Sequence, residues 1–292
     1  MSTRGTAPGD AWVPSPVQQE RLAYRRRRSR RSALIAAVST VVVLGAVAVA
    51  VVHTRGWPQF RHAFFDLSYG VQVLPDIAKG LWLNVRIMVV CEVVILVLAL
   101  LLALARSLRG PAFFPLRALS TVYTDVFRGL PALLVIFLLG FGVPSLRIGW
   151  LTSNALVWGS IGLILTYSAY VAEVFRAGIE SVHPSQRAAA RSLGLTHAQT
   201  MRHVVLPQAV RRVVPPLLND LVSLQKDTAL VAVLGTVYYD AVLQAQIDIA
   251  ESFNYTPYVV AGLLFLVLTI PLTRLTDWVA RRQGWAGATG PV

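Results

Sequence analysis

The chain alternates long apolar runs with shorter polar stretches that are mostly basic. The first run, from Ala33 to Val52, holds 20 residues without a charge, about the length that crosses a bilayer as a helix. Five further segments of similar or greater length follow it, at 81–104, 123–142, 155–179, 217–242 and 258–278. The pattern therefore predicts an all-α integral membrane protein with six spans, of which 217–242 is the least apolar.

The polar stretches divide the chain into five expected parts. Residues 1–31 combine Pro, Gly and Ser with an arginine cluster, a composition that predicts a disordered cytoplasmic tail. The other parts are an extra N-terminal transmembrane helix at 32–53, an extracytoplasmic segment at 54–79, a transmembrane domain with a five-helix core at 80–281, and a cytoplasmic tail at 282–292.

The distribution of basic residues predicts the orientation of these spans. The 292-residue chain is 55% hydrophobic and only 14% charged, against about 25% in a soluble domain, yet its net charge is +13. Most arginines fall in every second loop, while the opposite loops hold only Arg55, Arg61, Lys79 and Arg147. Basic loops remain cytoplasmic, so both termini are expected there. This arrangement, without an aromatic-basic or zinc pattern, also argues against nucleic-acid binding.

The sequence offers no catalytic or metal-binding constellation. A single cysteine, Cys91, rules out an intrachain disulfide, and neither Lys79 nor Lys226 lies in a phosphate-binding loop. The histidines lack a metal-ligand spacing. We therefore expect a chain that is not an enzyme and that binds no cofactor or metal itself.

Polar groups within the apolar segments mark candidate positions along a solute path. They are Glu92, Asp220, Lys226, Asp227 and Thr228. Charges at membrane depth usually face a bundle interior or an aqueous path, although a pairing that only holds helices together remains open. Asp220 and Lys226 are six residues apart, so on one helix they point to different sides. At most one of them is expected to face a given solute directly.

Two patterns near the cytoplasmic side predict local structure. Glu173, Arg176 and Glu180 have the i, i+3, i+7 spacing of an ion-pair ladder, either a solvated row or a brace for the loop that follows. Earlier in the chain, Gly129 and Pro131 are expected to bend the third span beside Arg128.

The polar stretch Ser185 to Pro207, between the fourth and fifth spans, reads as two short helices. Pro184 can open the first helix and Gly194 can close it in a left-handed conformation. Thr196 then begins the second with Gln199 completing a capping box, and Pro207 is expected to stop it. The small side chains on this element would permit close approach by another protein.

The spacing of this stretch resembles the signature of ABC importer permeases. That signature is Glu-Ala-Ala, three residues, Gly, nine residues and Ile-x-Leu-Pro, and here it becomes Ala188-Ala-Ala, Gly194 and Val204-Val-Leu-Pro207. Other stretches are similar to permeases of polar amino-acid importers, namely 123–131, 170–178, 206–209, 215–220 and 224–230. Residues 253–258 resemble the longer permease of glutamate importers.

The resemblance implies the type I ABC importer fold in the bacterial inner membrane. Two permease chains, identical or paralogous, would pair around the path; two ATPase subunits would carry ATP and Mg²⁺, and an extracytoplasmic binding protein would deliver the solute. ATPase coupling would involve Arg187, Ala188, Ala189, Arg191, Gly194, Leu206 and Pro207. Ala188 stands where the family has Glu and cannot make that residue's polar contact, so docking would rest on shape, backbone caps and nearby Arg187 or Arg191.

The function expected from the sequence is ATP-driven import of a polar amino acid, glutamate or glutamine first. Other solutes, such as methionine or an opine, remain open within the same class. An ion-driven carrier that acts alone is the alternative from another class, with Glu92 and Asp220 as its possible proton or sodium site.

Overall fold

The computed structural model describes residues 15–108, 110–235 and 239–283, and within these ranges the secondary structure is helical without strands. This agrees with the predicted all-α class. The chain forms two compact units, Met1–Arg61 and His62–Val292.

The first unit contains one long helix, α1 (Pro16–Val52). The Ser15 hydroxyl accepts from the Gln18 backbone N–H, and the Gln18 side chain accepts from the Ser15 N–H, which makes a capping box. The apolar part, Arg31–Val52, matches the predicted first span. The predicted disordered tail is wrong for residues 16–31, because the cap and a run of helix-forming Arg, Gln and Ala extend the helix. Residues 1–14 lie outside the described residues.

The second unit is a helical bundle crossed by one long helix, α3 (Leu67–Ser107), after the short α2 (Trp57–Phe64). The helices that follow are α4 (Phe114–Gly129), α5 (Ala132–Ser145), α6 (Ala155–Glu180), α7 (Pro184–Ser192), α8 (His197–Thr200), α9 (Leu206–Asp227), α10 (Ala241–Ser252) and α11 (Thr256–Arg282). Three short turns join them: the 3-10 turns η1 (Pro111–Phe113) and η3 (Thr228–Leu234), and the π-turn η2 (Met201–Val205).

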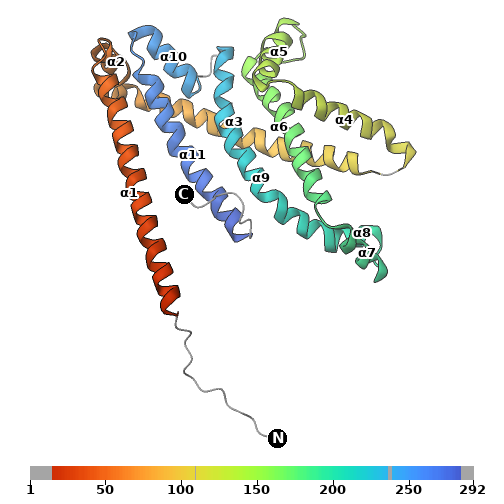
Figure 1. Ribbon diagram of the computed structural model, residues 1–292. Coiled ribbons are helices and arrows are strands. Elements are labelled where there is room, and N and C mark those ends of the chain that lie inside the picture. The colour runs from red at the N-terminus through yellow and green to blue at the C-terminus, as the bar shows by residue number, and fades with distance from the viewer. Residues whose placement is uncertain (1–14, 109, 236–238, 284–292) are drawn as a thin grey trace. The chain divides into compact units, whose positions relative to one another are not determined.

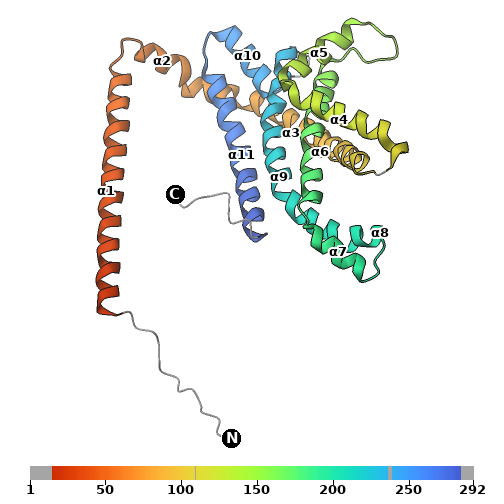
Figure 2. The same ribbon diagram turned by 45° about the vertical axis from the view of Figure 1, so that its right-hand side comes forward.

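Helix α3 contacts α11, α9 and α6, and Figure 1 shows it passing each of them in turn. The core lies where α3, α6 and α9 meet, and its most enclosed side chains include Ile95, Leu163 and Leu224. Helices α7 and α8 lie at one end of this bundle and α10 at the other (Figures 1 and 2). The stretch resembling a docking element is therefore presented at an end of the bundle, away from its core.

The spans agree only in part with the prediction. Four helices in the described residues are long and apolar enough to cross a membrane, or up to five if one bent pair counts as a single span. The bent pair consists of η1 with α4 (Pro111–Gly129) and α5, which meet at 102°. The bend lies at Leu130, whose ψ of 139° is extended, because the following Pro131 disfavours the helical conformation there. The expected bend is confirmed, but 123–142 is not one straight helix.

The predicted fifth span, 217–242, is wrong as a continuous helix. Helix α9 ends at Asp227, η3 follows, Gly235 adopts a left-handed φ of 56°, and α10 begins only at Ala241. The predicted second span, 81–104, is the inner part of the much longer α3, which the Asp66 carboxylate caps by accepting from the Tyr69 N–H. The six-span count and the cytoplasmic termini stay predictions.

Candidate functional site

The stretch between α6 and α9 folds as the helix–glycine–helix element that the sequence predicts. The His183 ring accepts from the Ser185 N–H at the start of α7, with Pro184 in the first turn. Gly194 has φ of 83°, and the Leu195 N–H donates back to the Ala190 carbonyl at 3.2 Å. Left-handed glycine and this backbone bond together close a helix.

Helix α8 begins with the predicted capping box, since Thr196 and Gln199 exchange side chain to backbone hydrogen bonds. The predicted stop at Pro207 is wrong. The chain continues through the π-turn η2 into α9, and Pro207 occupies the first turn of that helix. The Leu206 N–H donates to the Met201 carbonyl, the i to i−5 hydrogen bond of a π-helix. Proline is tolerated at the next position because an N–H in the first turn of a helix has no partner within that helix.

The base of this element is fastened to the helices on either side. The Arg187 guanidinium donates to the Ile179 carbonyl at the end of α6. Arg212 of α9 donates to the Ser181 carbonyl, just past the same end. Arg187 therefore faces inward and holds the loop to α6, so of the two candidate arginines only Arg191 lies on the exposed surface.

The outer surface of the element is small and partly apolar. Leu193 is 83% exposed, and open space surrounds Gly194. The other exposed candidates are Ala188, Ala189, Leu206 and Pro207.

A cavity of about 300 Å³ lies between α6 and α9, at the bend between α4 and α5. Helix α6 contributes Thr166, Tyr167 and Tyr170, and α9 contributes Asp220, Ser223 and Asp227. The Tyr167 hydroxyl donates to Asp227 Oδ2 at 2.7 Å. The cavity is the place where the structure gathers polar groups of α6 and α9, the two helices that the α7–α8 element joins.

The candidate path residues separate into three environments. Asp220 and Asp227 share the cavity, while Lys226 lines a second cavity with Thr269 of α11, so the expected division of Asp220 and Lys226 between different sides is confirmed. Thr228 does not line the α6–α9 cavity: it is fully buried, donates to the Gln225 carbonyl and accepts from Asn84 Nδ2.

Glu92 has no hydrogen-bond or ion-pair partner within the described ranges. The charge that acts on it there is the like charge of Asp220. A pairing that holds helices together is therefore not found for Glu92 among the described residues, and Glu92 instead lies within electrostatic reach of Asp220.

Sequence reasoning missed Thr166, Tyr167, Tyr170 and Ser223. All four are uncharged, so a search for charges within apolar runs passes over them. The signal that would have found them is helical spacing, since 166, 167 and 170 share one face of α6 while 220, 223 and 227 share one face of α9.

The predicted ion-pair ladder exists and reaches beyond one helix. Arg176 pairs with Glu173 and with Glu180, as the spacing predicts. Glu173 also accepts from Arg106 of α3 at 2.9 Å, and Arg128 of α4 lies 3.9 Å away. Glu173 therefore joins three helices, which a solvated row along α6 would not do.

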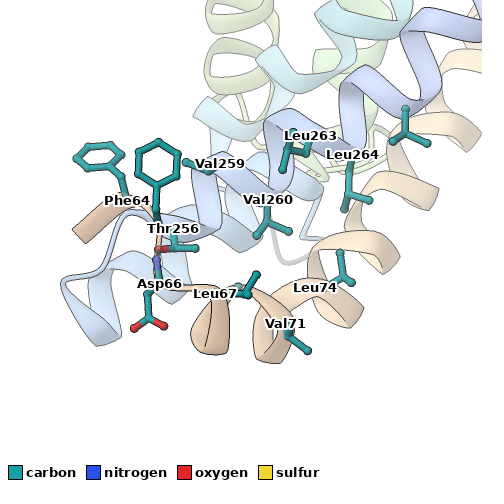
Figure 3. Close-up of a pocket in the computed structure, with 13 residues that line it drawn as sticks. Phe64, Asp66, Leu67, Val71, Leu74, Thr256, Val259, Val260, Leu263 and Leu264 are labelled. Atoms are coloured by element: carbon teal, nitrogen blue, oxygen red, sulfur yellow. Dashed lines mark hydrogen bonds between the residues drawn. The ribbon is translucent and has the colours of Figure 1, made fainter. Parts of the chain in front are cut away.

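A third hollow, an apolar groove of about 330 Å³, is unlike the cavity between α6 and α9. Figure 3 shows Leu67, Val71 and Leu74 of α3 beside Val260 and Leu264 of α11. The Asp66 carboxylate at its edge is engaged by the Ser68 hydroxyl and the Tyr69 N–H. The groove thus lacks free polar groups that would orient a solute.

Comparison with known proteins identifies similar chains. Residues 95–285 match the family described as binding-protein-dependent transport system inner membrane component. The arginine transport system permease protein ArtQ of Bacillus subtilis (strain 168) is 33% identical over 74% of this chain and 96% of its own length. The probable glutamine ABC transporter permease protein GlnM of the same organism is 36% identical over 60% of this chain and 79% of its own.

Solved structures agree with these matches. A chain from a crystal structure of an amino acid ABC transporter with histidines aligns with a TM-score of 0.67 and 31% identity, covering 74% of this chain and 98% of its own. A chain of the MetNI methionine ABC transporter in an inward-facing conformation aligns with a TM-score of 0.57 and 20% identity over 71% of this chain and 95% of its own, a likeness of fold alone.

Proposed function

The chain belongs to the family of binding-protein-dependent transport system inner membrane components, and on that premise we propose that it forms the translocation path of an ATP-driven importer of polar amino acids. As a member of this family it is a multi-pass protein of the inner membrane with the fold of type I ABC importer permeases. Its relatives include amino-acid ABC permeases named for arginine and glutamine transport, and both of these amino acids are polar.

One observation carries the proposal: the docking element connects the two helices that line the polar cavity. Helix α6 enters α7 through the turn that Arg187 and Arg212 fasten, and η2 leads from α8 directly into α9. A force on the exposed surface around Gly194 would therefore act on α6 and α9 together. Rocking these two helices would change access to the cavity between them, a two-state rearrangement biased by a partner's ligand.

The partners follow from this mechanism. Two ATPase subunits would bind the α7–α8 elements of a permease pair, and the ATP and Mg²⁺ would be held by those subunits. A binding protein would supply the solute from outside, and the second permease chain would be a copy or a paralogue. Because Ala188 has no polar group, the exposed Leu193 and the backbone around Gly194 would carry the ATPase contact.

The finer hypothesis from the sequence is that glutamate or glutamine is the imported solute. One relative is named for glutamine transport, which supports glutamine as the solute, whereas glutamate is supported only by the resemblance of residues 253–258. The charge of the cavity bears on this choice.

Substitution of Gly194 tests the coupling role. A β-branched residue is strained at φ of 83°, by about 1–2 kcal/mol, so Gly194→Val would distort the junction of α7 and α8. We expect ATP-dependent uptake into proteoliposomes to fall at least tenfold, while the transporter still assembles. The measurement is uptake of labelled amino acid with the ATPase and binding protein present, together with the rate of ATP hydrolysis.

Gly194→Asn is the matched control, because asparagine tolerates the left-handed conformation better than other residues with a side chain. It should retain most of the uptake. Equal uptake by the Val variant and the unmodified protein would contradict a coupling role for this element. Uptake by the single chain in liposomes without any ATPase would instead favour the ion-driven carrier.

A further inference from the structure

Two polar atoms in the α6–α9 cavity are buried without a partner. Thr166 is 2% exposed, and its Oγ1 has no hydrogen-bond partner among the described residues. The same holds for Asp220 Oδ2 on the facing helix. Leaving a buried polar atom unpaired is costly, more so when it is charged. Because both residues line the same cavity, a bound molecule that satisfies them would recover that cost.

The charge of the cavity is negative. Asp220 and Asp227 are its ionisable acids, and none of the described lining residues is basic. Two cations adjoin lining residues without lining the cavity: Arg128 lies over the ring of Tyr170 and beside Glu173, and Lys226 lines the other cavity. Glu92 of α3 lies within electrostatic reach of Asp220, and the two acidic groups repel each other. Unpaired carboxylates at membrane depth are unfavourable, so this cavity favours a cationic ligand.

The amino acids offered to the path differ in how well they meet this charge. Every free amino acid brings one ammonium and one carboxylate group, which cancel. A glutamine side chain adds no charge and leaves the two negative charges of the aspartates in place, and a glutamate side chain adds a third negative charge. An arginine or lysine side chain supplies a second cation, so that each aspartate can face one positive group.

The positions of the aspartates suit a long ligand with two cationic ends. Asp220 and Asp227 are seven residues apart on α9, which separates them by about 10 Å along the helix. The hydroxyl groups of Thr166 and Ser223 lie in the same cavity and can donate to the ligand's carboxylate. The Tyr167 hydroxyl holds one oxygen of Asp227 and thereby fixes the direction of that carboxylate.

We propose that this cavity selects amino acids with a cationic side chain, such as arginine or lysine, over glutamine and glutamate. The inference rests on the proposed function, since it names the substrate class that the same path would carry. Asp220 is the residue with the most direct role, because its Oδ2 is the unpaired charged atom.

The test is ligand binding to the purified complex of permease and ATPase without the binding protein, which would otherwise impose its own selectivity. Labelled arginine, lysine, glutamine and glutamate serve as probes. We expect arginine or lysine to bind at least tenfold more tightly than glutamine, and glutamate to bind least. Asp220→Asn should weaken arginine binding at least tenfold and glutamine binding less than twofold, whereas Asp220→Glu should restore part of the arginine binding.

Asp76→Asn is the matched control, since it makes the same change at an exposed aspartate of α3 that lines neither cavity, and it should leave arginine binding unchanged. Preferred binding of glutamine or glutamate, an equal loss for all ligands in Asp220→Asn, or no binding of any of them would overturn the proposal. The proposed function is judged separately by ATP-dependent uptake in the full system. Uptake of glutamine in that system with no preference for cationic amino acids would contradict the selectivity proposal alone. Absence of all amino-acid uptake would contradict both the selectivity proposal and the proposed function.

Discussion

Gly80→Ala is expected to destabilise the bundle more than any other single methyl group added to it. A Cβ at this position in α3 would lie 2.6 Å from the Ala241 nitrogen and 2.7 Å from the Asp240 carbonyl carbon, both backbone atoms at the start of α10. Backbone atoms cannot rotate away as side chains do, so α10 must move. That movement would break the hydrogen bond from the Ala241 N–H to Asn84 Oδ1, which is 3.0 Å long and buried.

Overpacking costs about 1–3 kcal/mol and a buried unpaired N–H another 1–3 kcal/mol, so we expect a loss of about 2–6 kcal/mol in the free energy of unfolding. Cys91 provides the measurement: it is the chain's single cysteine and is 1% exposed, so a thiol-reactive dye reports unfolding on heating. Gly262→Ala in α11 is the control, because nothing lies within 4 Å of its added Cβ. An equal midpoint of thermal unfolding for both variants would show that α3 and α10 do not pack this closely in the protein.

The features that the sequence predicts well are those set by neighbouring residues. The caps at Pro184, Gly194 and Thr196 each depend on residues within one helical turn, and all three form as expected. The bend at Pro131 and the pairing of Arg176 with Glu173 are local in the same sense. Separation of Asp220 from Lys226 follows from helical geometry alone and is also found.

The features that the sequence does not predict depend on which helices pack together. The contact of Gly80 with α10 joins positions about 160 residues apart, and no local pattern announces it. Average hydropathy across 217–242 hides the break after Asp227, because apolar residues on both sides outweigh the polar ones. Tyr167 and Thr166 read as ordinary members of an apolar span until α9 places two aspartates opposite them.

Helix packing also gives Glu173 a structural role that its spacing in the sequence does not indicate. As part of an i, i+3, i+7 row it is one member of a surface ladder, which contributes little to stability. In the bundle it is about one-fifth exposed and accepts from Arg106 of α3 as well as from Arg176. Arg106 also donates to the Thr124 hydroxyl of α4, so the cluster ties α3, α4 and α6 together.

Glu173→Ala is therefore expected to lower the free energy of unfolding by about 2–4 kcal/mol, somewhat below the cost of breaking a fully buried pair because the site is partly exposed. The physical reason is that Arg106 would keep only a neutral hydroxyl partner. The dye reaction at Cys91 on heating again gives the midpoint. Glu173→Gln keeps an acceptor but not the charge, so its midpoint of thermal unfolding should lie between those of the unmodified protein and Glu173→Ala.

Glu180→Ala supplies the matched control for this second prediction. Its side chain is 59% exposed and it pairs with Arg176 alone, so its loss should cost less than about 1 kcal/mol. A similar midpoint of thermal unfolding for the Glu173 and Glu180 variants would mean that the ion pair with Arg106 adds no stability to that of the Glu173–Arg176–Glu180 ladder. A large difference that disappears when Arg106 is also replaced by Ala would assign the energy to the contact between α3 and α6, because only the pair is then missing. Such a contact would hold α6 near the turn that Arg187 fastens, through which the α7–α8 element acts on the cavity in the proposed function.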